Sequence, residues 1–387
     1  MPSGGNRMAR LPVAAPDLAG TEKRYVLEAL RSSWISSTGP FVDRFEREFA
    51  ELCGTRTAVS VANGTAALHV ALMALGAGPG DEVITPSLTY IATANAVRYV
   101  GAEPVFVDVD PATWGLDPAR LEAAVTPRTK GIIAVHLYGH PADMDAINAV
   151  AAAHGLWVVE DAAEAHFARY TGRPVGGLGT IGTFSFYGNK VITSGEGGAL
   201  TLNDPDLERR VRLLRGQGMD PERRYHFPIV GYNYRLTNVA CALLCAQLER
   251  REEIIARRKR VFDAYRRQLK KIPGIGLQPV APWAEPAPWL FCITVDEAAY
   301  GCSRDDLMAQ LAEEEIETRP FFIPLHVLPP YRDASRRRGD RLPVTERLGA
   351  TGMNLPTYGR MRRQDIFRVT EAVRRRAALA ASPGGAR

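Results

Sequence analysis

The stretch GIIAVHLYGHPADMDAINAVAAAHGLWVVED, residues 131–161, decides the fold because it reads as strand, helix and strand. Its two ends, 131–138 and 156–161, are short apolar runs rich in Val and Ile. Between them a helical stretch at 143–155 closes on Gly155, a residue suited to a helix C-terminus. Apolar strands that alternate with helices indicate a mostly parallel sheet covered on both faces. The stretch therefore predicts one unit of an α/β domain.

The same alternation extends on both sides of this stretch, over residues 57–203, and predicts a large domain. Further strands are expected at 57–62, 81–86, 103–109, 182–188 and 198–203, and a further helix is expected at 65–77. We place the boundaries of this large domain at residues 15 and 250.

After residue 204 the pattern changes and predicts a smaller α+β domain over 251–387. A helix is expected at 207–218, and a long amphipathic helix at 237–271 is expected to bridge the two domains. The smaller domain is expected to contain a strand at 289–296, a helix that begins with the capping pair Ser303 and Asp306, a strand near 317–323 and a last helix at 364–381.

The composition is that of a soluble globular protein. A hydrophobic fraction of 46% and a charged fraction of 24% exclude disorder, collagen-like repeats and coiled coil. The net charge of +5 comes from 48 basic and 43 acidic residues. This near balance creates no strong field of one sign, so the charge does not indicate nucleic acid as a partner. The five cysteines form no CxxC pair, and no run resembles a signal peptide or a membrane span. These features predict a cytoplasmic protein that binds neither nucleic acid nor membrane.

The first candidate functional stretch is ANGTAALHVAL, residues 62–72, a turn of small residues between a strand and a helix. Gly64 and Thr65 would present free backbone N–H groups at the helix N-terminus, and the Thr65 hydroxyl would lie beside them. Such a helix start suits a phosphate group. An ordinary capped turn with no ligand is the alternative.

Two further stretches carry an acid and a lysine. VVEDAAEAH, residues 158–166, places Asp161 at the end of a strand, where open α/β sheets bind ligands, although a helix N-cap is the alternative. In TFSFYGNKVITSGEGGALTLND, residues 183–204, a strand carries Ser185 and leads to Lys190 among glycines. A lysine in a partly desolvated turn can act as an amine nucleophile and base, whereas a surface lysine in a glycine loop is the alternative.

Together the three stretches supply what a pyridoxal phosphate enzyme needs. Lys190 would hold the cofactor aldehyde as a Schiff base, and Asp161 would keep the pyridine nitrogen protonated. Tyr90, which follows the strand at 81–86, is placed to cover the ring face.

Two motifs point elsewhere. GLGTIG at 177–182 matches the GxGxxG pattern, but a strand and not a helix follows it, so an NAD-dependent oxidoreductase is only a remote alternative. His136 and His140 have a spacing seen in metal sites. In an extended strand, however, residues four positions apart are too distant to bind one metal ion easily, and no carboxylate pattern completes the set. We therefore expect no metal.

These motifs, with PSLTYIATANAV, GYNYRLTNVACALLCAQLERR and RPFFIPLH, resemble the DegT/DnrJ/EryC1/StrS family of pyridoxal phosphate sugar aminotransferases from about residue 15 to 380. The resemblance implies a type I, aspartate aminotransferase-like fold. SFYGNK, FFIPLH and the run 216–238 are most similar to the perosamine synthase group, which aminates C4 of a nucleotide-linked 4-keto-6-deoxyhexose. A 3-keto sugar nucleotide or an inosose stays open as the substrate, and so does the choice among GDP, dTDP and UDP.

The resemblance also implies roles for residues around the cofactor. Lys190 matches the Schiff-base lysine, Asp161 matches the acid at the pyridine nitrogen, and Glu164 falls near the phenolic oxygen. The remaining matches are three phosphate-binding residues and one stacking aromatic, namely Gly64, Thr65, Ser185 and Tyr90.

Other implied roles concern the partner subunit and the substrates. Asn238 matches an asparagine that reaches the cofactor phosphate of the other subunit, which requires a homodimer. Trp34 and Ser36 within WISSTGP, and His326, resemble residues of the sugar-nucleotide pocket. The expected amino donor is L-glutamate.

Overall fold

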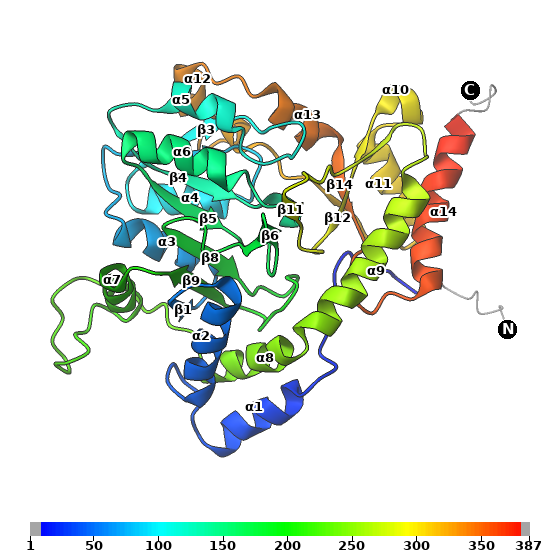
Figure 1. Ribbon diagram of the computed structural model, residues 1–387. Coiled ribbons are helices and arrows are strands. Elements are labelled where there is room, and N and C mark those ends of the chain that lie inside the picture. Colours follow the sequence, from blue (N-terminus) through cyan, green and yellow to red (C-terminus); the bar gives the residue numbers. More distant parts are fainter. Residues whose placement is uncertain (1–8, 381–387) are drawn as a thin grey trace.

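A seven-stranded sheet organises the larger lobe of the computed structural model, which describes residues 9–380 (Figure 1). Its strands lie in the order β1-β9-β8-β5-β4-β2-β3, and only β9 runs antiparallel to its two neighbours. They are β1 (Thr57–Val61), β2 (Glu82–Pro86), β3 (Glu103–Val107), β4 (Thr129–Val135), β5 (Trp157–Asp161), β8 (Ile181–Ser185) and β9 (Gly198–Leu202). The seven predicted strands are thus confirmed, and the sheet is mostly parallel.

Helices cover both faces of this sheet, because its strands bury side chains on both sides. In β4, Ile132 and Ala134 belong to one apolar cluster with α5 and α6, whereas Ile133 and Val135 belong to another with α2, α3 and α8. The helices of this lobe are α1 (Glu22–Arg31), α2 (Pro40–Cys53), α3 (Gly64–Ala74), α4 (Ala92–Tyr99), α5 (Leu121–Ala124), α6 (Met144–His154), α7 (Pro205–Arg215) and α8 (Asn238–Glu249). Gly155 ends α6 with a φ of 64°, as its position predicted.

The smaller lobe is built on a four-stranded antiparallel sheet in the order β10-β12-β14-β13. Its strands are β10 (Ile275–Leu277), β12 (Phe291–Val295), β13 (Arg319–Pro320) and β14 (Gly352–Leu355). Its helices are α9 (Arg251–Leu269), α10 (Glu297–Tyr300), α11 (Arg304–Glu313), α12 (Arg332–Arg338), α13 (Pro343–Thr351) and α14 (Arg363–Ala380). A capping box between Ser303 and Asp306 starts α11, as predicted. A third, small sheet joins β6 (Arg169–Tyr170), β7 (Arg173–Pro174) and β11 (Ala284–Glu285).

The smaller lobe has its own core, to which the start of the chain contributes. Leu11 packs in one cluster with Val261 of α9 and Val369 of α14. Its backbone N–H donates to the Glu315 carbonyl at 2.8 Å, and its carbonyl accepts from the Glu317 N–H at 2.9 Å. The smaller lobe is therefore made from both ends of the chain.

The predicted single helix over 237–271 was wrong, because the structure divides it into α8 and α9 at Arg250. Arg250 has non-helical backbone angles, and its guanidinium pairs with Asp17 and Glu22 at 3.5 Å and with Glu253 at 2.9 Å. Helix α8 packs on α1 and α2 in the larger lobe, whereas α9 packs on α14 in the smaller one (Figure 1). We propose residue 250 as the boundary between the two domains for this reason.

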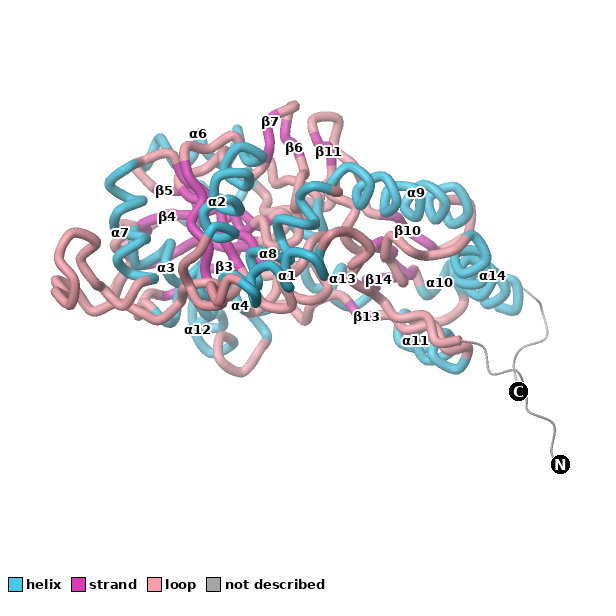
Figure 2. Tube along the Cα trace, turned by 90° about the horizontal axis from the view of Figure 1, so that it is seen from below, coloured by secondary structure: helices cyan, strands magenta, loops and turns pink. Residues whose placement is uncertain are grey.

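The segment 216–237 between α7 and α8 projects from the larger lobe, at the left of Figure 2, and we call it the arm. Its side chains Tyr225 and Val230 are 72% and 86% exposed.

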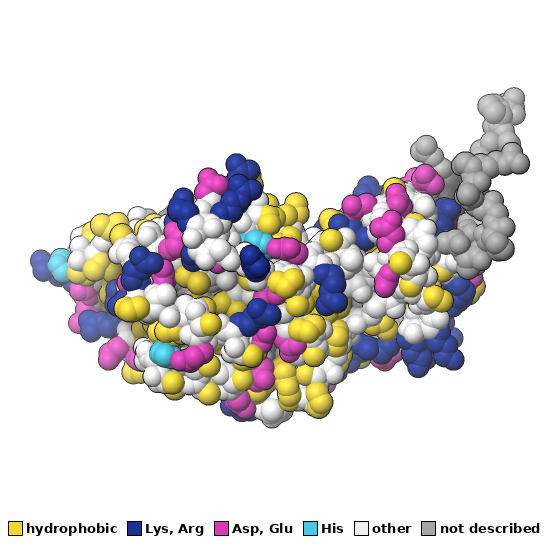
Figure 3. Space-filling model, turned by 90° about the horizontal axis from the view of Figure 1, so that it is seen from above, with side chains coloured by type: hydrophobic (Ala, Val, Ile, Leu, Met, Phe, Trp, Pro, Cys, Tyr) yellow, Lys and Arg dark blue, Asp and Glu magenta, His cyan; other side chains and the backbone are white. Residues whose placement is uncertain are grey.

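Basic and acidic side chains are mixed over the face shown in Figure 3. Among the described residues, no helix combines the length and the apolar character needed to span a membrane.

Candidate active site

A cavity of about 490 Å³ lies at the carboxyl ends of the parallel strands, where the two lobes meet. The loops after β1, β2, β4, β5 and β8 line it from the larger lobe, and β13 and β14 line it from the smaller one. The candidate residues among its lining are Gly64, Thr65, Tyr90, Asp161, Glu164, Ser185 and Lys190. Four separate segments of the chain, at the ends of β1, β2, β5 and β8, thus bring these predicted residues into one site.

The start of α3 forms a cradle beside Ser185. The Asn63 side chain caps the helix by accepting a hydrogen bond from the Ala66 N–H at 2.8 Å. Gly64 and Thr65 are the first two residues of the helix, so their N–H groups have no partner within it. A Cβ atom on Gly64 would lie 2.7 Å from the Ser185 Cβ, so only glycine lets the helix approach this closely. The cradle combines N–H donors with the hydroxyls of Thr65 and Ser185, which suits a phosphate group.

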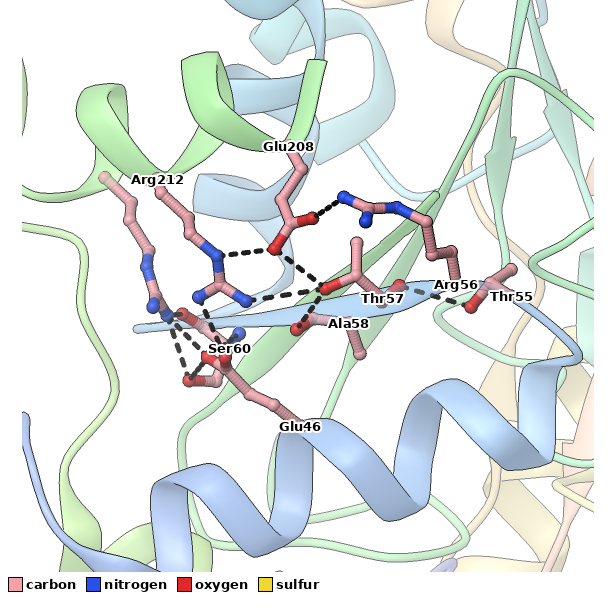
Figure 4. Close-up of polar contacts among 9 residues, drawn as sticks. Glu46, Thr55, Arg56, Thr57, Ala58, Ser60, Glu208 and Arg212 are labelled. Atoms are coloured by element: carbon pink, nitrogen blue, oxygen red, sulfur yellow. Dashed lines mark hydrogen bonds and ion pairs between the residues drawn. The ribbon is translucent and has the colours of Figure 1, made fainter. Parts of the chain in front are cut away.

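A partly buried ion network fixes the strand that leads into this cradle (Figure 4). Glu46 of α2 accepts hydrogen bonds from the Ser60 N–H of β1 at 2.9 Å, from Arg212 at 2.9 Å and from Arg215 at 2.8 Å. Burial opposes the charge on Glu46, but Arg215 and Arg212 outweigh it and hold the pKa of this carboxyl below its ordinary value. The network therefore ties α2, β1 and α7 together below the cradle.

Asp161 is the last residue of β5, and its carboxyl group is buried at the cavity. It accepts a hydrogen bond from the Thr93 hydroxyl at 2.8 Å and another from the Ala163 N–H at 3.3 Å. Burial raises the pKa of Asp161, and these two hydrogen bonds oppose that rise. The carboxyl is thus held in one orientation, where a cationic partner in the cavity would stabilise its charged form.

Glu164 lies three residues after Asp161 and is also buried at the cavity. One of its carboxyl oxygens accepts a hydrogen bond from the Tyr138 N–H at 2.7 Å. Tyr138 adopts a left-handed φ of 51°, which is unusual for a residue with a side chain. Burial raises the pKa of Glu164 to about 7, so this group exchanges a proton near neutral pH.

Lys190 follows β8 in a tight turn, in which its N–H donates to the Tyr187 carbonyl at 2.9 Å. Its Nζ lies 4.2 Å from the centre of the Trp289 ring. The Trp289 indole in turn donates to the Asn189 carbonyl at 2.8 Å, which fixes the ring. Burial lowers the pKa of the Lys190 amine more than the carboxyls of Glu164 and Asp161 raise it. The amine is therefore shifted toward its neutral, nucleophilic form.

An aromatic wall completes the cavity, and sequence reasoning found only part of it. Tyr90 is 58% exposed at the rim, with its ring centre 5.8 Å from that of Phe322. Tyr138, Trp289 and Phe322 line the cavity but were not predicted as site residues. Phe322 stands in the RPFFIPLH motif, whereas no local pattern marks Trp289.

Four predicted residues lie outside the cavity lining. Trp34 is 52% exposed, and Ser36 accepts a backbone hydrogen bond from Asn238. The Asn238 amide accepts from the Phe41 N–H at 2.9 Å and donates to the Trp34 carbonyl at 2.6 Å, so it holds the start of α2. His326 is buried between Ser87, at 2.8 Å, and Glu346, at 3.1 Å. Their roles toward the sugar nucleotide and the partner subunit stay predictions.

The motifs that pointed elsewhere have structural roles. Glu160 accepts hydrogen bonds from the N–H groups of Gly176, Leu178 and Gly179, each at 2.7 Å, and thereby folds the GLGTIG turn, which then enters β8. His136 contacts the same carboxyl at 3.1 Å. His140 accepts from the Ala281 N–H at 3.1 Å. The GLGTIG turn therefore lacks the helix that a dinucleotide site requires.

Replacing Gly64 by alanine should disturb the cradle, since the new Cβ would press on Ser185. Overpacking of this kind costs about 1–3 kcal/mol in the free energy of unfolding, and we expect a weaker affinity for pyridoxal phosphate as well. Gly188→Ala is the matched control, because a Cβ there meets nothing within 4 Å. Denaturant unfolding and cofactor titration of both variants give the answer, and equal behaviour of the two would contradict the assignment.

The buried Glu164 carboxyl should make stability depend on pH. Its pKa is about 7 in the folded chain against 4.5 as the ordinary value, so the folded state holds its proton more tightly. That stabilisation is complete below pH 4.5 and is lost as the pH rises through 7, by roughly 3 kcal/mol in all. Urea unfolding of the apoenzyme at pH 5 and pH 8 should show this loss in the wild type and a smaller one in Glu164→Gln. Glu196→Gln, at the same cavity, is the control.

Comparison with known proteins agrees with this geometry. The profile of the DegT/DnrJ/EryC1/StrS aminotransferase family matches residues 16–374, and the chain belongs to this family. It is 51% identical to a GDP-perosamine synthase from Caulobacter vibrioides over 95% of this chain and 98% of that one. It is 42% identical to a GDP-perosamine synthase from Escherichia coli O157:H7, over 95% and 98%.

Solved structures match over nearly the whole chain. The structure of DesV from S. venezuelae in complex with a ketimine intermediate is 39% identical, with a TM-score of 0.88 over 96% of this chain and 99% of that one. The structure of DesI in the presence of its TDP-sugar product is 37% identical, with a TM-score of 0.88 over 97% and 94%. The predicted type I aminotransferase fold is confirmed.

Proposed function

We propose that this chain uses pyridoxal phosphate to transfer the amino group of L-glutamate to the C4 keto group of a nucleotide-linked 4-keto-6-deoxyhexose. The observation that carries the proposal is the meeting of Lys190, Asp161 and Glu164 beside the Gly64 cradle in one cavity. Membership of an aminotransferase family and high identity to two GDP-perosamine synthases support it.

The residues present fit the cofactor. The N–H groups of Gly64 and Thr65, with the hydroxyls of Thr65 and Ser185, would hold its phosphate. Asp161 would face the pyridine nitrogen, Glu164 the phenolic oxygen and Tyr90 the ring. In addition, the buried Oδ1 of Asn189 lines the cavity without a hydrogen-bond partner among residues 9–380, as expected of a site built to receive a polar ligand.

Pyridoxal phosphate, when bound, supplies an aldehyde for a Schiff base and a ring that withdraws electrons from the reacting carbon. Asp161 holds a proton on the ring nitrogen, because a buried carboxylate favours a cation beside it. In the first half of the reaction, the neutral Lys190 amine takes the proton from the α-carbon of the donor. In the second half, it delivers a proton to the sugar carbon that receives the nitrogen. Proton transfer by a positioned group is typically worth about 10²–10⁴ in rate.

A spectroscopic experiment tests the reaction. Purified protein loaded with pyridoxal phosphate should lose its visible absorption when L-glutamate is added. The absorption should return with a 4-keto-6-deoxyhexose linked to GDP or to dTDP, offered separately. If the visible absorption is lost with L-glutamate but does not return, the chain is still an aminotransferase, but the 4-keto sugar is not its substrate. 3-Keto sugar nucleotides are then offered next. Absence of colour even with added cofactor would contradict the proposal.

We also propose that the active unit is a homodimer in which Asn238 of one copy approaches the other copy's cofactor phosphate. Exposed apolar side chains support this proposal: Tyr225 and Val230 on the arm, and Leu27, Leu30 and Ile35 near α1. Each of these side chains could be buried in an interface between two copies of the chain. Light scattering on the purified protein measures the oligomeric state directly.

A further inference from the structure

We infer that Arg319 binds the α-carboxylate of the amino donor. The inference rests on the proposed function and adds to it the group that recognises the donor. It starts from the charges around the cavity. Besides Lys190, the charged side chains that line it are the carboxyls Asp161, Glu164 and Glu196 and the guanidinium of Arg319. Arg319 is the one arginine in this lining, so it is the cavity's main candidate for binding an anionic substrate.

The Arg319 guanidinium is available for a ligand. Among residues 9–380, no carboxylate oxygen lies within 4.0 Å of it. Arginines nearby are occupied: Arg304, for example, bonds Asp305 and the Gly352 carbonyl, both at 2.6 Å. Arg319 belongs to β13 and pairs in register with Asn354 of β14, so the sheet of the smaller lobe fixes its backbone. Arg319 is exposed, lines the cavity and has no ion-pair partner in the described part of the chain, and its strand is paired in the sheet. It is therefore well placed to bind an anion.

The position of Arg319 relative to Lys190 indicates which anion it binds. The two side chains line the same cavity, and the positive charge of Arg319 contributes to the lowered pKa of the Lys190 amine. Lys190 must reach the α-carbon of the donor, and the α-carboxylate is attached to that carbon. The diphosphate of a sugar nucleotide is attached at C1, several bonds from the C4 carbon that Lys190 must reach. A cation that shares the cavity with Lys190 and whose charge acts on its amine therefore suits the carboxylate better than the diphosphate.

The shape of the guanidinium adds specificity. Its planar N–H groups match the two oxygens of a carboxylate, whereas a lysine ammonium is a point charge that cannot form the paired contact. Arg319→Lys should therefore recover only part of the donor affinity that Arg319→Gln loses.

Binding of two stable cofactor adducts to the apoenzyme tests the inference without turnover. One is N-(5′-phosphopyridoxyl)-L-glutamate, and the other is the adduct of 4-aminobutyrate, which keeps the distal carboxylate and lacks the α-carboxylate. Wild-type apoenzyme should prefer the glutamate adduct by about 10- to 100-fold, the usual worth of a hydrogen-bonded charge pair. Arg319→Gln should lose this preference while its affinity for pyridoxal phosphate stays the same.

The control is Arg267→Gln, an exposed arginine on α9 that does not line the cavity. It should keep the wild-type preference. Retention of the preference in Arg319→Gln would overturn the inference and leave the proposed function standing. Weaker GDP binding by Arg319→Gln, with the preference intact, would also overturn it and assign Arg319 to the nucleotide. Wild-type protein that binds neither pyridoxal phosphate nor either adduct would instead contradict the proposed function, and the inference with it.

Discussion

Lys190→Ala should reduce turnover with L-glutamate and a keto sugar nucleotide by at least about 10⁴-fold. In the proposed mechanism, the substitution removes the amine that moves the proton, a contribution of about 10²–10⁴, and also the nucleophile that attaches the cofactor. No other lysine lines the cavity, so among the described residues none replaces it there. Steady-state kcat, measured with both substrates saturating, gives the result.

Cofactor binding is the control for this experiment, because Lys190→Ala leaves the phosphate cradle unchanged. The variant should still bind pyridoxal phosphate, with the absorption of the free aldehyde. Lys259→Ala, an exposed lysine of α9, should show wild-type turnover. A Lys190→Ala enzyme within tenfold of the wild-type rate would refute the assignment of this residue.

Asp161→Asn should lower kcat by about 10²–10³-fold, the usual effect of removing one group that stabilises charge in a buried site. The amide has nearly the same shape, and the Thr93 hydroxyl at 2.8 Å remains to orient it, so the fold should survive. What would be lost is the negative charge that we propose holds a proton on the ring nitrogen. The kinetic measurement is the same as for Lys190→Ala, with an absorption spectrum of the bound cofactor at several pH values.

Asp145→Asn is the matched control for the loss of a carboxylate. Asp145 lies on the surface of α6, where it pairs with Arg173 at 2.6 Å. Its substitution should leave kcat unchanged. If Asp161→Asn matched this control in both rate and spectrum, Asp161 would have no role at the ring nitrogen.

Much of the larger lobe is predictable from sequence because its strands are short apolar runs separated by helices. The strand at 157–161 and the helix at 144–154 are identified by local runs of apolar residues, most of which are buried in the structure. The break at Arg250 is different, since apolar residues keep a helical spacing on both sides of it. At the break, Arg250 pairs with Glu253 nearby and with Asp17 and Glu22, which are far away in sequence. Likewise, the strand expected near 317–323 is limited to Arg319–Pro320, and Pro320 has no N–H to donate to a neighbouring strand.

In the site, too, some residues are placed by the local strand pattern and others by contacts between distant parts of the chain. Asp161 and Ser185 end parallel strands and Lys190 follows one of them, and the carboxyl ends of these strands meet at one edge of the sheet, so the topology brings the three residues together. Trp289 and Arg319 come from the smaller lobe, and their place depends on how the two lobes pack. No local pattern contains that information, and a sequence of one chain also lacks what a partner subunit would add near Asn238.

The backbone pairing of Leu11 with Ile316 determines when the core of the smaller lobe can be completed as the protein is synthesised. Leu11 leaves the ribosome at the outset, but Ile316 emerges about 300 residues later, roughly 15–60 seconds at usual translation speeds. During that interval all residues of the larger lobe are synthesised, but Leu11 does not yet have Ile316 to pair with. A chain shortened to the family match at residue 16 would lack this piece of the smaller lobe's core altogether.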